Sequence, residues 1–370
     1  MKCEIKTLGE LSIEGKGSYG IAASAVEYSP NLYTYLRITD INDDGTIKKD
    51  GLKSVADDRA EEYLLRPNDI VFARTGASTG RNYFYDGSDG EFVYAGFLIK
   101  FSIDTQKVNP YYIKYFCQSD IYKQWVQSFN TGSTRGNINA KTYSDMQIPL
   151  PPRKQQDFLV SILKPIDDKI AANKEINKNL EEQAQLFYKK FDFNCQAWRE
   201  GTVGDVVTLQ RGYDLPKTKM IKGKYPVAGS TDTIFYHNQY MAEPPCIVLG
   251  RSGNIGKPRL YLEPCWPHNT SLFTKQFKNS NPLWVYFMLY HLDYSMFQGG
   301  SAVPTLNRNH IHSYAIKIPP IAEQNKFAQT IEPLIKAIFH NRKEIETLSK
   351  LRDTLLPRLM SGEIDVSCVS

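Results

Sequence analysis

Several features of secreted and membrane proteins are missing from this chain of 370 residues. It has no run of about 18 apolar residues, so the sequence predicts no membrane-spanning helix. Its first residues, Met1 to Lys6, lack the apolar core of a secretory signal. The six cysteines lie far apart without a Cys-x-x-Cys pair, so neither a zinc site nor a disulfide framework is indicated. We therefore expect reduced thiols, a cytoplasmic location and no membrane partner.

Recognised catalytic signatures are missing as well. The chain contains neither Asn-Pro-Pro-Tyr nor Asp-Pro-Pro-Tyr, which would indicate a methyltransferase, and no Gly-x-Ser-x-Gly elbow. The segment 250–258 resembles a phosphate loop, but its spacing is wrong and Pro258 stands where Ser or Thr would bind magnesium. His310 and His312 have no nearby cluster of carboxylates or thiols to complete a metal site. We assign no catalytic residue and no metal ligand, which disfavours a free-standing nuclease or methyltransferase.

What the chain does contain is a long internal repeat. Residues 132–180 align with 300–348 without a gap, at a constant offset of 168. Shorter similarities continue upstream with gaps, and they pair 109–113 with 281–285, 69–76 with 246–253, and 7–11 with 202–206. Two similar halves can present two similar surfaces related by a pseudo-two-fold axis, and duplex DNA is a ligand with that symmetry.

The formal net charge of +5 is unevenly distributed. Residues 199–320 carry 13 basic and 7 acidic side chains, whereas nine acids of the first half lie between Asp40 and Asp69. This acidic stretch falls in the largest insertion of the first half, between Leu11 and Asp69. We expect a surface excursion there rather than a DNA contact, because phosphate would repel it. The basic second half is compatible with nucleic-acid binding and equally with an ordinary solvated surface.

Each half ends in a segment with helical periodicity. After Pro151-Pro152 and Pro319-Pro320, the seam positions alternate steps of four and three residues, from 159 to 191 and from 327 to 359. Such a heptad seam is typical of a helix packed along a partner helix, and we expect the two helices to pair antiparallel with one globular part at each end. The globular parts, with short apolar runs and many turn residues, indicate buried strands mixed with short helices. The predicted fold is therefore α+β, with two similar α/β domains joined by two long helices that pair as an antiparallel coiled coil.

Two pairs of residues qualify this prediction. Pro165 and Pro333 fall at matching positions, and we expect each to end a short helix and to begin a longer one. Residues 165–191 would then form a rod of about 40 Å, roughly one turn of duplex DNA. Asn173 and Asn341 are polar at the same heptad position, where a buried Asn fixes the register of the pair. A solvent-facing Asn is the alternative.

Candidate ligand-binding residues lie in basic, glycine-containing turns. The segments 74–81 and 251–257 each combine an Arg-Thr-Gly or Arg-Ser-Gly turn with a later glycine and a basic residue. Their side chains have the chemistry to meet phosphates or base edges, whereas a tight hairpin whose glycines serve backbone geometry is the alternative. The polar segments after Gly132-Ser133 and Gly300-Ser301 have similar chemistry, or only cap and turn the chain. The candidates are Arg74, Arg81, Arg135, Asn137, Lys141, Arg251, Lys257, Arg308 and Asn309.

The order of these segments resembles a known family. A globular region is followed by Gly-Ser…Asn, then by Ile148-Pro149-Leu150-Pro151-Pro152…Gln156, then by a helix with Asp167-Asp168-Lys169-Ile170. The scheme then repeats and closes with residues 348–364. Over nearly the whole chain, this order is similar to that of the specificity subunit of type I restriction-modification systems. The resemblance implies two target recognition domains, 1–151 and 199–319, and two helical spacer regions, 152–198 and 320–370.

The resemblance also implies a function. Each target recognition domain would recognise one part of a bipartite site in double-stranded DNA, and the helices would dock two methyltransferase subunits. S-adenosylmethionine would belong to those subunits, and ATP and magnesium to restriction subunits. This chain would then be a non-catalytic recognition subunit without a cofactor of its own. The alternative is a coiled-coil scaffold whose two globular heads bind protein partners.

Overall fold

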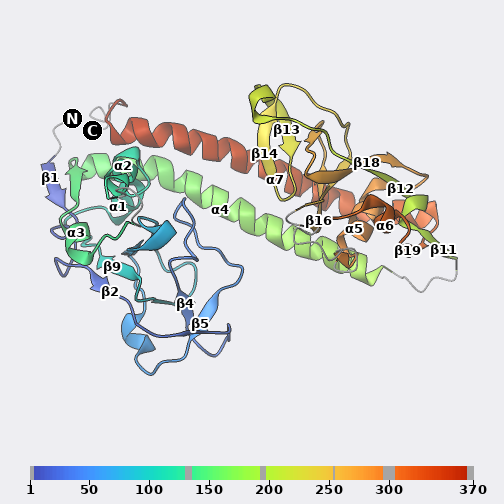
Figure 1. Ribbon diagram of the computed structural model, residues 1–370. Helices are drawn as coiled ribbons and strands as arrows, with labels where there is room; N and C mark the ends of the chain where they lie inside the picture. The colour runs from blue at the N-terminus through green and yellow to red at the C-terminus, as the bar shows by residue number, and fades with distance from the viewer. Residues whose placement is uncertain (1–3, 130–135, 192–196, 253–254, 295–304, 365–370) are drawn as a thin grey trace. The chain divides into compact units, whose positions relative to one another are not determined.

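The structure is a computed structural model that describes residues 4–129, 136–191, 197–252, 255–294 and 305–364 (Figure 1). Its contacts divide the chain into two units: unit 1 comprises Met1–Ala171 and Glu346–Ser370, and unit 2 comprises Ala172–Ile345. The two longest helices, α4 (Arg153–Lys190) and α7 (Ile321–Met360), therefore each contribute one part to unit 1 and another to unit 2. No helix in the described part of the chain is long and apolar enough to cross a membrane.

In unit 1 the strands form small sheets around buried apolar runs. β1 (Glu4–Thr7) pairs antiparallel with β10 (Gln147–Leu150). A second sheet has the order β2–β9–β6–β7, with bounds Ser18–Tyr19, Leu98–Ser102, Asp69–Ala73 and Asn82–Tyr85. A third has the order β3–β5–β4–β8, with bounds Ala25–Val26, Lys53–Val55, Thr34–Leu36 and Phe92–Tyr94. β6 is buried along its whole length, as its continuous apolar run predicts.

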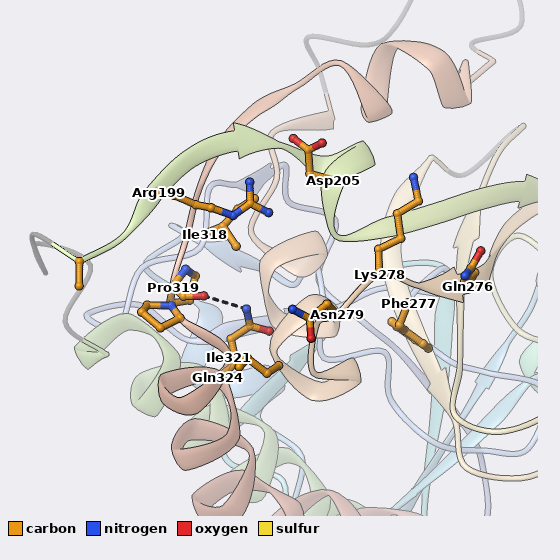
Figure 2. Close-up of a pocket in the computed structure, with 12 residues that line it drawn as sticks. Arg199, Asp205, Gln276, Phe277, Lys278, Asn279, Ile318, Pro319, Ile321 and Gln324 are labelled. Carbon is orange, nitrogen blue, oxygen red and sulfur yellow. Dashed lines mark hydrogen bonds between the residues drawn. The ribbon is translucent and has the colours of Figure 1, made fainter.

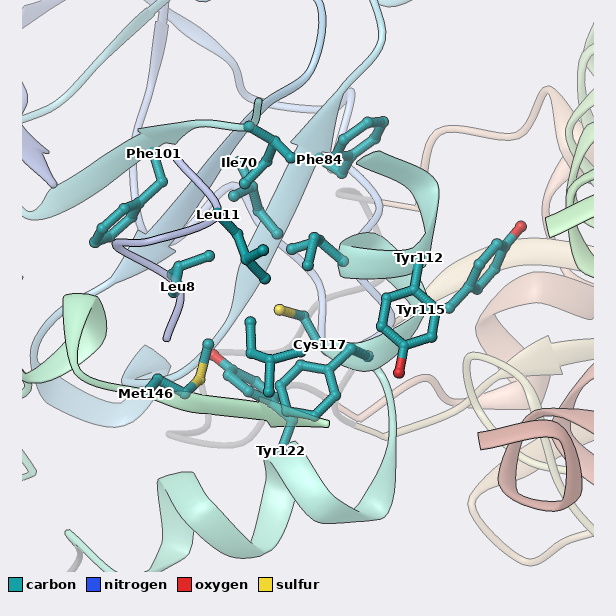
Figure 3. Packing of buried hydrophobic residues seen from close by; sticks show 14 of the residues in the cluster. Leu8, Leu11, Ile70, Phe84, Phe101, Tyr112, Tyr115, Cys117, Tyr122 and Met146 are labelled. Atoms are coloured by element: carbon teal, nitrogen blue, oxygen red, sulfur yellow. The ribbon is translucent and has the colours of Figure 1, made fainter. Parts of the chain in front are cut away.

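Short helices connect these strands. They are η1 (Ala60–Tyr63), η2 (Gly76–Ser78), α1 (Pro110–Phe116), α2 (Asp120–Gln127) and α3 (Ala140–Ser144). The side chain of Asn109 caps α1 by accepting a main-chain N–H of its first turn, and Pro110 takes the first helical position. Tyr112 and Tyr115 of α1 share one core with strand residues and with Leu8 (Figure 3). The same core takes in side chains of both long helices, namely Leu159, Leu163, Leu356 and Leu359.

Unit 2 repeats this arrangement. Its sheets are β11–β19 (Arg199–Thr202, Ala315–Ile318), β12–β18–β15–β16 (Val207–Arg211, Ser271–Phe277, Cys246–Gly250, Gly256–Tyr261) and β14–β13–β17 (Thr233–His237, Lys222–Ala228, Trp266–Pro267). Its short helices are η3 (Val203–Asp205), η4 (Lys217–Lys219), α5 (Pro282–Tyr290) and α6 (Arg308–His312). α5 begins as α1 does, with an Asn cap at Asn281 followed by proline. The sequence repeat is thus a repeat of tertiary structure, and the predicted α+β fold of two similar domains is confirmed.

The structure also aligns a part of the repeat that the sequence left unmatched. The parallel pairing of β4 with β8 corresponds to that of β13 with β17, which makes Leu36 equivalent to Ala228, 192 positions later. The next matched pair, Asp69 and Cys246, is 177 positions apart, so the first domain has fifteen extra residues between Leu36 and Asp69. The acidic residues lie in this interval. The insertion, which was predicted between Leu11 and Asp69, is therefore placed more narrowly between Leu36 and Asp69.

Gly20 and Gly212 form another equivalent pair. Each donates its main-chain N–H to the neighbouring strand segment of its own domain. A Cβ at these positions would lie 2.2 Å and 2.1 Å, respectively, from main-chain oxygen atoms, so neither position has room for a side chain. The preceding residues, Tyr19 and Arg211, are therefore held at the same place in the two domains.

The long helices correct the prediction about Pro165 and Pro333. Neither proline ends a helix, since α4 runs unbroken through Pro165 and α7 through Pro333. Both prolines are exposed, and so are Ser161 and Gln329, whose carbonyl groups lose their helical N–H partner. Water can replace that partner on an exposed face, which lowers the free-energy cost of each proline. The packing of the helix along its seam offsets the cost that remains. With 38 and 40 residues, the helices are about 57 and 60 Å long, longer than the predicted rod of about 40 Å.

Within unit 2 the two long helices pair antiparallel, as predicted. Asn173 Nδ2 donates to Glu344 Oε2 at 2.8 Å, and further along α4 the ring of Tyr188 packs edge-on against Phe327, with 5.7 Å between ring centres. Later residues of α4 therefore contact earlier residues of α7, as in an antiparallel pair. Asn173 is only 1% exposed, so the solvent-facing alternative is wrong there. A buried Asn that is bonded across the pair favours a single register.

In unit 1 the first part of α4 pairs with the last part of α7. The carboxylate of Asp167 lies 3.3 Å from the guanidinium of Arg352 and accepts a hydrogen bond from the Tyr115 hydroxyl at 3.0 Å. One residue of α4 thus connects α1 and α7. One detail of the predicted seam is wrong: Phe187 is exposed and the neighbouring Tyr188 is buried. The seam drifts by one residue near the end of α4, because a straight helix does not keep the 3.5-residue period.

A glutamine in the first turn of each long helix fixes that helix to its domain. Gln324 Oε1 accepts the Asn281 N–H at 2.8 Å. Gln324 Nε2 donates to Pro319 O at 2.9 Å, the bond that Figure 2 shows as a dashed line. Gln156 makes the equivalent bonds in unit 1, at 2.9 and 2.8 Å. Both glutamines are at most 2% exposed, so the main-chain groups that they bond have no ready substitute from solvent.

Candidate nucleic-acid interface

Arg74 lies where separate segments of unit 1 meet. Its main-chain N–H donates to Phe97 O at 3.1 Å, and its carbonyl accepts from Ile138 N at 2.9 Å. The next residue, Thr75, forms a β-bridge with Asn137. These bonds join the end of β6 to the turn between β8 and β9 and to the segment before α3. The candidates Arg74 and Asn137, which are far apart in the sequence, are thereby neighbours.

The side chain of Arg74 lies over an exposed tyrosine. Its guanidinium carbon is 5.0 Å from the ring centre of Tyr19, within the range of a cation–π contact. The Tyr19 hydroxyl accepts the Ala140 N–H at 3.2 Å, at the start of α3. Tyr19 and Phe97 are both exposed, and no sequence motif indicated either of them, because they come from a strand and a turn that only the fold brings together. One sequence signal could have indicated Tyr19. It is followed by a glycine, Gly20, and the equivalent residue of the second domain, Arg211, is followed by Gly212.

Unit 2 repeats this junction around Arg251. The Arg251 N–H donates to Thr270 O at 2.9 Å, and its carbonyl accepts from Leu306 N at 2.8 Å. Arg251 therefore has the place in its domain that Arg74 has in the other, with Thr270 in place of Phe97. The repeated sequence and the repeated hydrogen bonds thus identify the same site twice.

Arg81 and Lys257, at the ends of the two turns, have different surroundings. Arg81 Nε donates to Asp43 Oδ1 at 2.6 Å and its Nη1 to a main-chain oxygen at 3.2 Å, so the acidic insertion engages this guanidinium. Lys257 is exposed and has a φ of 41°, directly after Gly256 with a φ of 87°. The expectation that glycines serve the geometry of this hairpin is confirmed at Gly256.

The remaining candidates lie in or beside the short helices α3 and α6. Asn139 and Asn307 cap these helices, and each side chain accepts a main-chain N–H. Close to the caps are four exposed candidates, Asn137, Lys141, Arg308 and Asn309. Three further parts of the prediction lie outside the described residues, namely Arg135, Gly132-Ser133 and Gly300-Ser301.

Arg74 and Arg251 share an electrostatic property. Among the described residues, no carboxylate forms an ion pair with either guanidinium, and Nε of Arg74 is buried without a hydrogen-bond partner. Arg81 and Arg259, in contrast, are paired with aspartates at 2.6 and 2.7 Å. A half-buried cation with unused donors is costly unless a ligand satisfies them. The two equivalent arginines are thus suited to an anionic or acceptor-rich ligand.

His312 has a structural role in unit 2. In the sequence, its spacing from His310 had given only a weak indication of a metal site. Its Nε2 accepts the Leu209 N–H at 2.8 Å, which requires a lone pair on that nitrogen and therefore a neutral ring. Burial lowers the pKa of His312, and the nearby charges of Lys278 and Arg308 lower it further. Throughout the described residues, no group of three or more His, Cys, Asp or Glu side chains could hold a metal ion.

Unit 2 is expected to lose stability as the solution is acidified through the titration of His312. Because folding lowers the pKa of this ring, its contribution is complete above the unfolded value of about 6.5 and is lost as the pH falls below that value. Denaturant unfolding of the parent and of His312→Gln between about pH 5 and pH 8 measures the effect. The variant should lack this pH dependence, and His310→Gln, at an exposed neighbour, should retain it. A parent and a His312→Gln variant with the same pH dependence would contradict the assignment.

A cavity of about 680 Å³ opens beside the start of α7 in unit 2 (Figure 2). Its charged lining residues include Asp205 and Lys278. The Asp205 carboxylate accepts the main-chain N–H and the hydroxyl of Thr202 at 2.7 and 3.0 Å, and Lys278 Nζ donates to Gly204 O at 2.7 Å. These two charged groups therefore stabilise the local fold of the domain rather than forming an acid–base pair.

Known proteins share both the sequence pattern and the fold. The family model for the type I restriction modification DNA specificity domain matches residues 2–182 and 196–350. The MjaIX specificity subunit of a type I restriction enzyme from Methanocaldococcus jannaschii is 24% identical over 300 residues, which are 69% of each chain. The MjaVIII specificity subunit from the same organism is 20% identical over 352 residues, which are 83% of this chain and 81% of the relative. The crystal structure of an S subunit from M. genitalium has a TM-score of 0.64 at 16% identity, over 97% of this chain and 96% of that one, which shows the shared fold.

The two regions that match the family model correspond to the two structural repeats. Each region contains one α/β domain and a large part of the long helix that follows it. The equivalent arginines, Arg74 and Arg251, lie one in each region. The chain therefore belongs to the family of type I restriction-modification specificity subunits, and it is a non-catalytic DNA-recognition subunit.

Proposed function

We propose that each α/β domain recognises one half of a bipartite DNA site, with residues 1–151 and 199–319 as the two target recognition domains. The observation that carries this proposal is the equivalence of Arg74 and Arg251, neither of which has an ion pair among the described residues. Guanidinium groups bind phosphate oxygens, or the two acceptors of guanine in the major groove. Because the domains share one frame but differ around these arginines, we expect two different half-sites.

Around each arginine we propose further contacts with DNA. In the first domain they are made by Arg81, Arg135, Asn137 and Lys141, and in the second by Lys257, Arg308 and Asn309. Arg81 would have to exchange its ion pair with Asp43 for a phosphate, so we expect it to contribute less than the others. The exposed Lys and Arg side chains are expected to position the duplex, and Arg74 and Arg251 to read it.

We also propose that the long helices of the spacer regions, 152–198 and 320–370, dock two methyltransferase subunits. Exposed apolar side chains on these helices support the proposal, because a partner helix would remove them from water. They are Ile176, Leu186 and Phe187 on α4 and Ile321 and Leu351 on α7. In this assembly S-adenosylmethionine belongs to the methyltransferase subunits, and ATP and magnesium belong to restriction subunits. The assembly would act in the cytoplasm.

Binding of the chain, in complex with its methyltransferase subunits, to a duplex that carries its site is expected to weaken steeply with salt. Each neutralised phosphate changes the slope of log K against log salt concentration by about −0.9, so six contacts predict a slope of roughly −5. Methylation mapping of the source genome supplies the site, and fluorescence anisotropy between about 50 and 200 mM salt measures the slope. A duplex with a scrambled site is the control. Absent or salt-insensitive binding would favour the alternative, a coiled-coil scaffold whose heads bind proteins.

A further inference from the structure

A surface of the first domain extends this proposal beyond its arginine. We propose that Phe97 reads a thymine of the first half-site by apolar contact with the thymine 5-methyl group, beside a base edge that Arg74 binds. The inference rests on the proposed function, because it takes the first domain to bind duplex DNA. It adds to that function the residue that distinguishes thymine from other bases and the chemical group, the 5-methyl group, that this residue recognises.

Phe97 is presented on a rigid turn. The Leu98 N–H donates to Ala95 O at 2.8 Å, which closes a four-residue turn with Phe97 at its third position. Phe97 O accepts the Arg74 N–H at 3.1 Å, so the main chain of the turn is held at its tip as well. Phe97 is nevertheless 59% exposed. A large apolar ring that the fold holds in water gains free energy when a ligand covers it, and little entropy is lost because the turn is already ordered.

The groups around Phe97 indicate which ligand covers it. Arg74 has a buried Nε without a partner among the described residues, and its guanidinium lies over the ring of Tyr19. Tyr19 is tethered in turn by its hydrogen bond to the Ala140 N–H. The surface therefore combines a guanidinium with an unused donor and an exposed apolar ring on a hydrogen-bonded turn. The major groove of DNA presents the matching pair of features, since guanine offers two acceptors and thymine offers a methyl group.

The second domain provides an internal comparison. Its equivalent turn is closed by the Ser271 N–H and His268 O at 2.9 Å, and it carries Thr270 at the tip. The hydroxyl of Thr270 lies at hydrogen-bond distance from His268 Nδ1, 3.1 Å away. Arg211 takes the place that Tyr19 has in the first domain. The exposed aromatic pair is thus not needed to build this junction, and its presence in one domain alone points to a role in distinguishing the two half-sites.

The test replaces each thymine of the first half-site in turn by uracil, which removes only the methyl group. For the parent chain in complex with its methyltransferase subunits, we expect about fourfold weaker binding at one position, the effect of uncovering one methyl group. Phe97→Ala should bind the all-thymine duplex at least fourfold more weakly and should no longer distinguish thymine from uracil at that position. Uracil in the second half-site should affect the parent and the variant equally.

Tyr28→Ala is the matched control, because Tyr28 is an aromatic residue of the same unit with a similar exposure of 57%. It should retain the discrimination of the parent chain. The inference is wrong if Phe97→Ala keeps the parent ratio at every position, or if the first half-site contains no thymine. Equal losses on thymine and uracil duplexes would indicate a wedge between base pairs and would also overturn methyl recognition. If neither the parent nor Tyr28→Ala binds the mapped site specifically, the proposed function itself fails.

Discussion

Exchange of residues 202–307 for the corresponding segment of another family member is expected to change one half of the methylated DNA site and to leave the other half intact. The segment contains Arg251 and every described strand of the second domain between β11 and β19. The first domain lies wholly outside it. Since direct readout depends on side chains at the protein–DNA contact, the new half-site should be the one that the donor domain recognises.

The structure supports both ends of this segment and sets one condition on the donor. The exchange begins at Thr202, the last residue of β11, so that residues 199–201 and their partner strand β19 stay in place, and it ends at Asn307, the cap of α6. The main-chain N–H of Asn281 is bonded by Gln324, which also stays. The Asn281 side chain also donates to Asn325 Oδ1 at 3.0 Å, so the donor should have Asn-Pro where this chain has Asn281-Pro282, and the domain then keeps its attachment to α7.

Methylation mapping of cells that carry the parent or the exchanged chain, with the methyltransferase subunits, measures the outcome. Arg251→Ala in the parent is the matched point variant. It should weaken recognition of the same half-site by about 1–3 kcal/mol and spare the other, as expected for the loss of one bidentate contact. A change in both half-sites would contradict independent recognition by the two domains. An unchanged site would show that the second domain does not read DNA.

Gln324→Ala is expected to lower the free energy of unfolding by about 2–4 kcal/mol. The side chain is 1% exposed and bonds the Asn281 N–H and Pro319 O, so its removal leaves a donor and an acceptor without partners. It also leaves a gap between α5 and the start of α7. Gln156→Ala should have a similar effect on unit 1, because Gln156 makes the equivalent bonds.

Denaturant unfolding measures the loss of stability, and hydrogen exchange shows where it occurs. In Gln324→Ala the Asn281 amide should exchange faster, while the Asn109 amide, bonded by Gln156, should be unchanged. Gln329→Ala is the control, because Gln329 is an exposed glutamine of the same helix. A loss below about 0.5 kcal/mol, the usual range of surface substitutions, would show that water replaces the glutamine and that the junction does not depend on it.

Much of the candidate site could be predicted, and the remainder follows from long-range pairing. Arg74 and Arg251 were found because the repeat places the same Arg-[Ser/Thr]-Gly turn in both halves. Arg81 was a candidate on the same grounds, yet Asp43 of the insertion reaches it in three dimensions. Phe97 carries no local signal at all. Its importance comes from one main-chain hydrogen bond with Arg74, just beyond the paired strands β6 and β9, and no spacing in the sequence encodes which strands pair.

The sequence by itself determined the duplication and the heptad seam, because each depends on residue types at fixed spacings. Only the tertiary structure decided that α4 and α7 continue through Pro165 and Pro333, since this depends on which face of each helix meets water. It also decided that the Arg74 guanidinium lies over Tyr19 and that the Arg74 main chain is bonded to Phe97. Local spacing sets which element forms, whereas exposure and strand pairing set which side chains meet, and the second kind of information exists only in the folded chain.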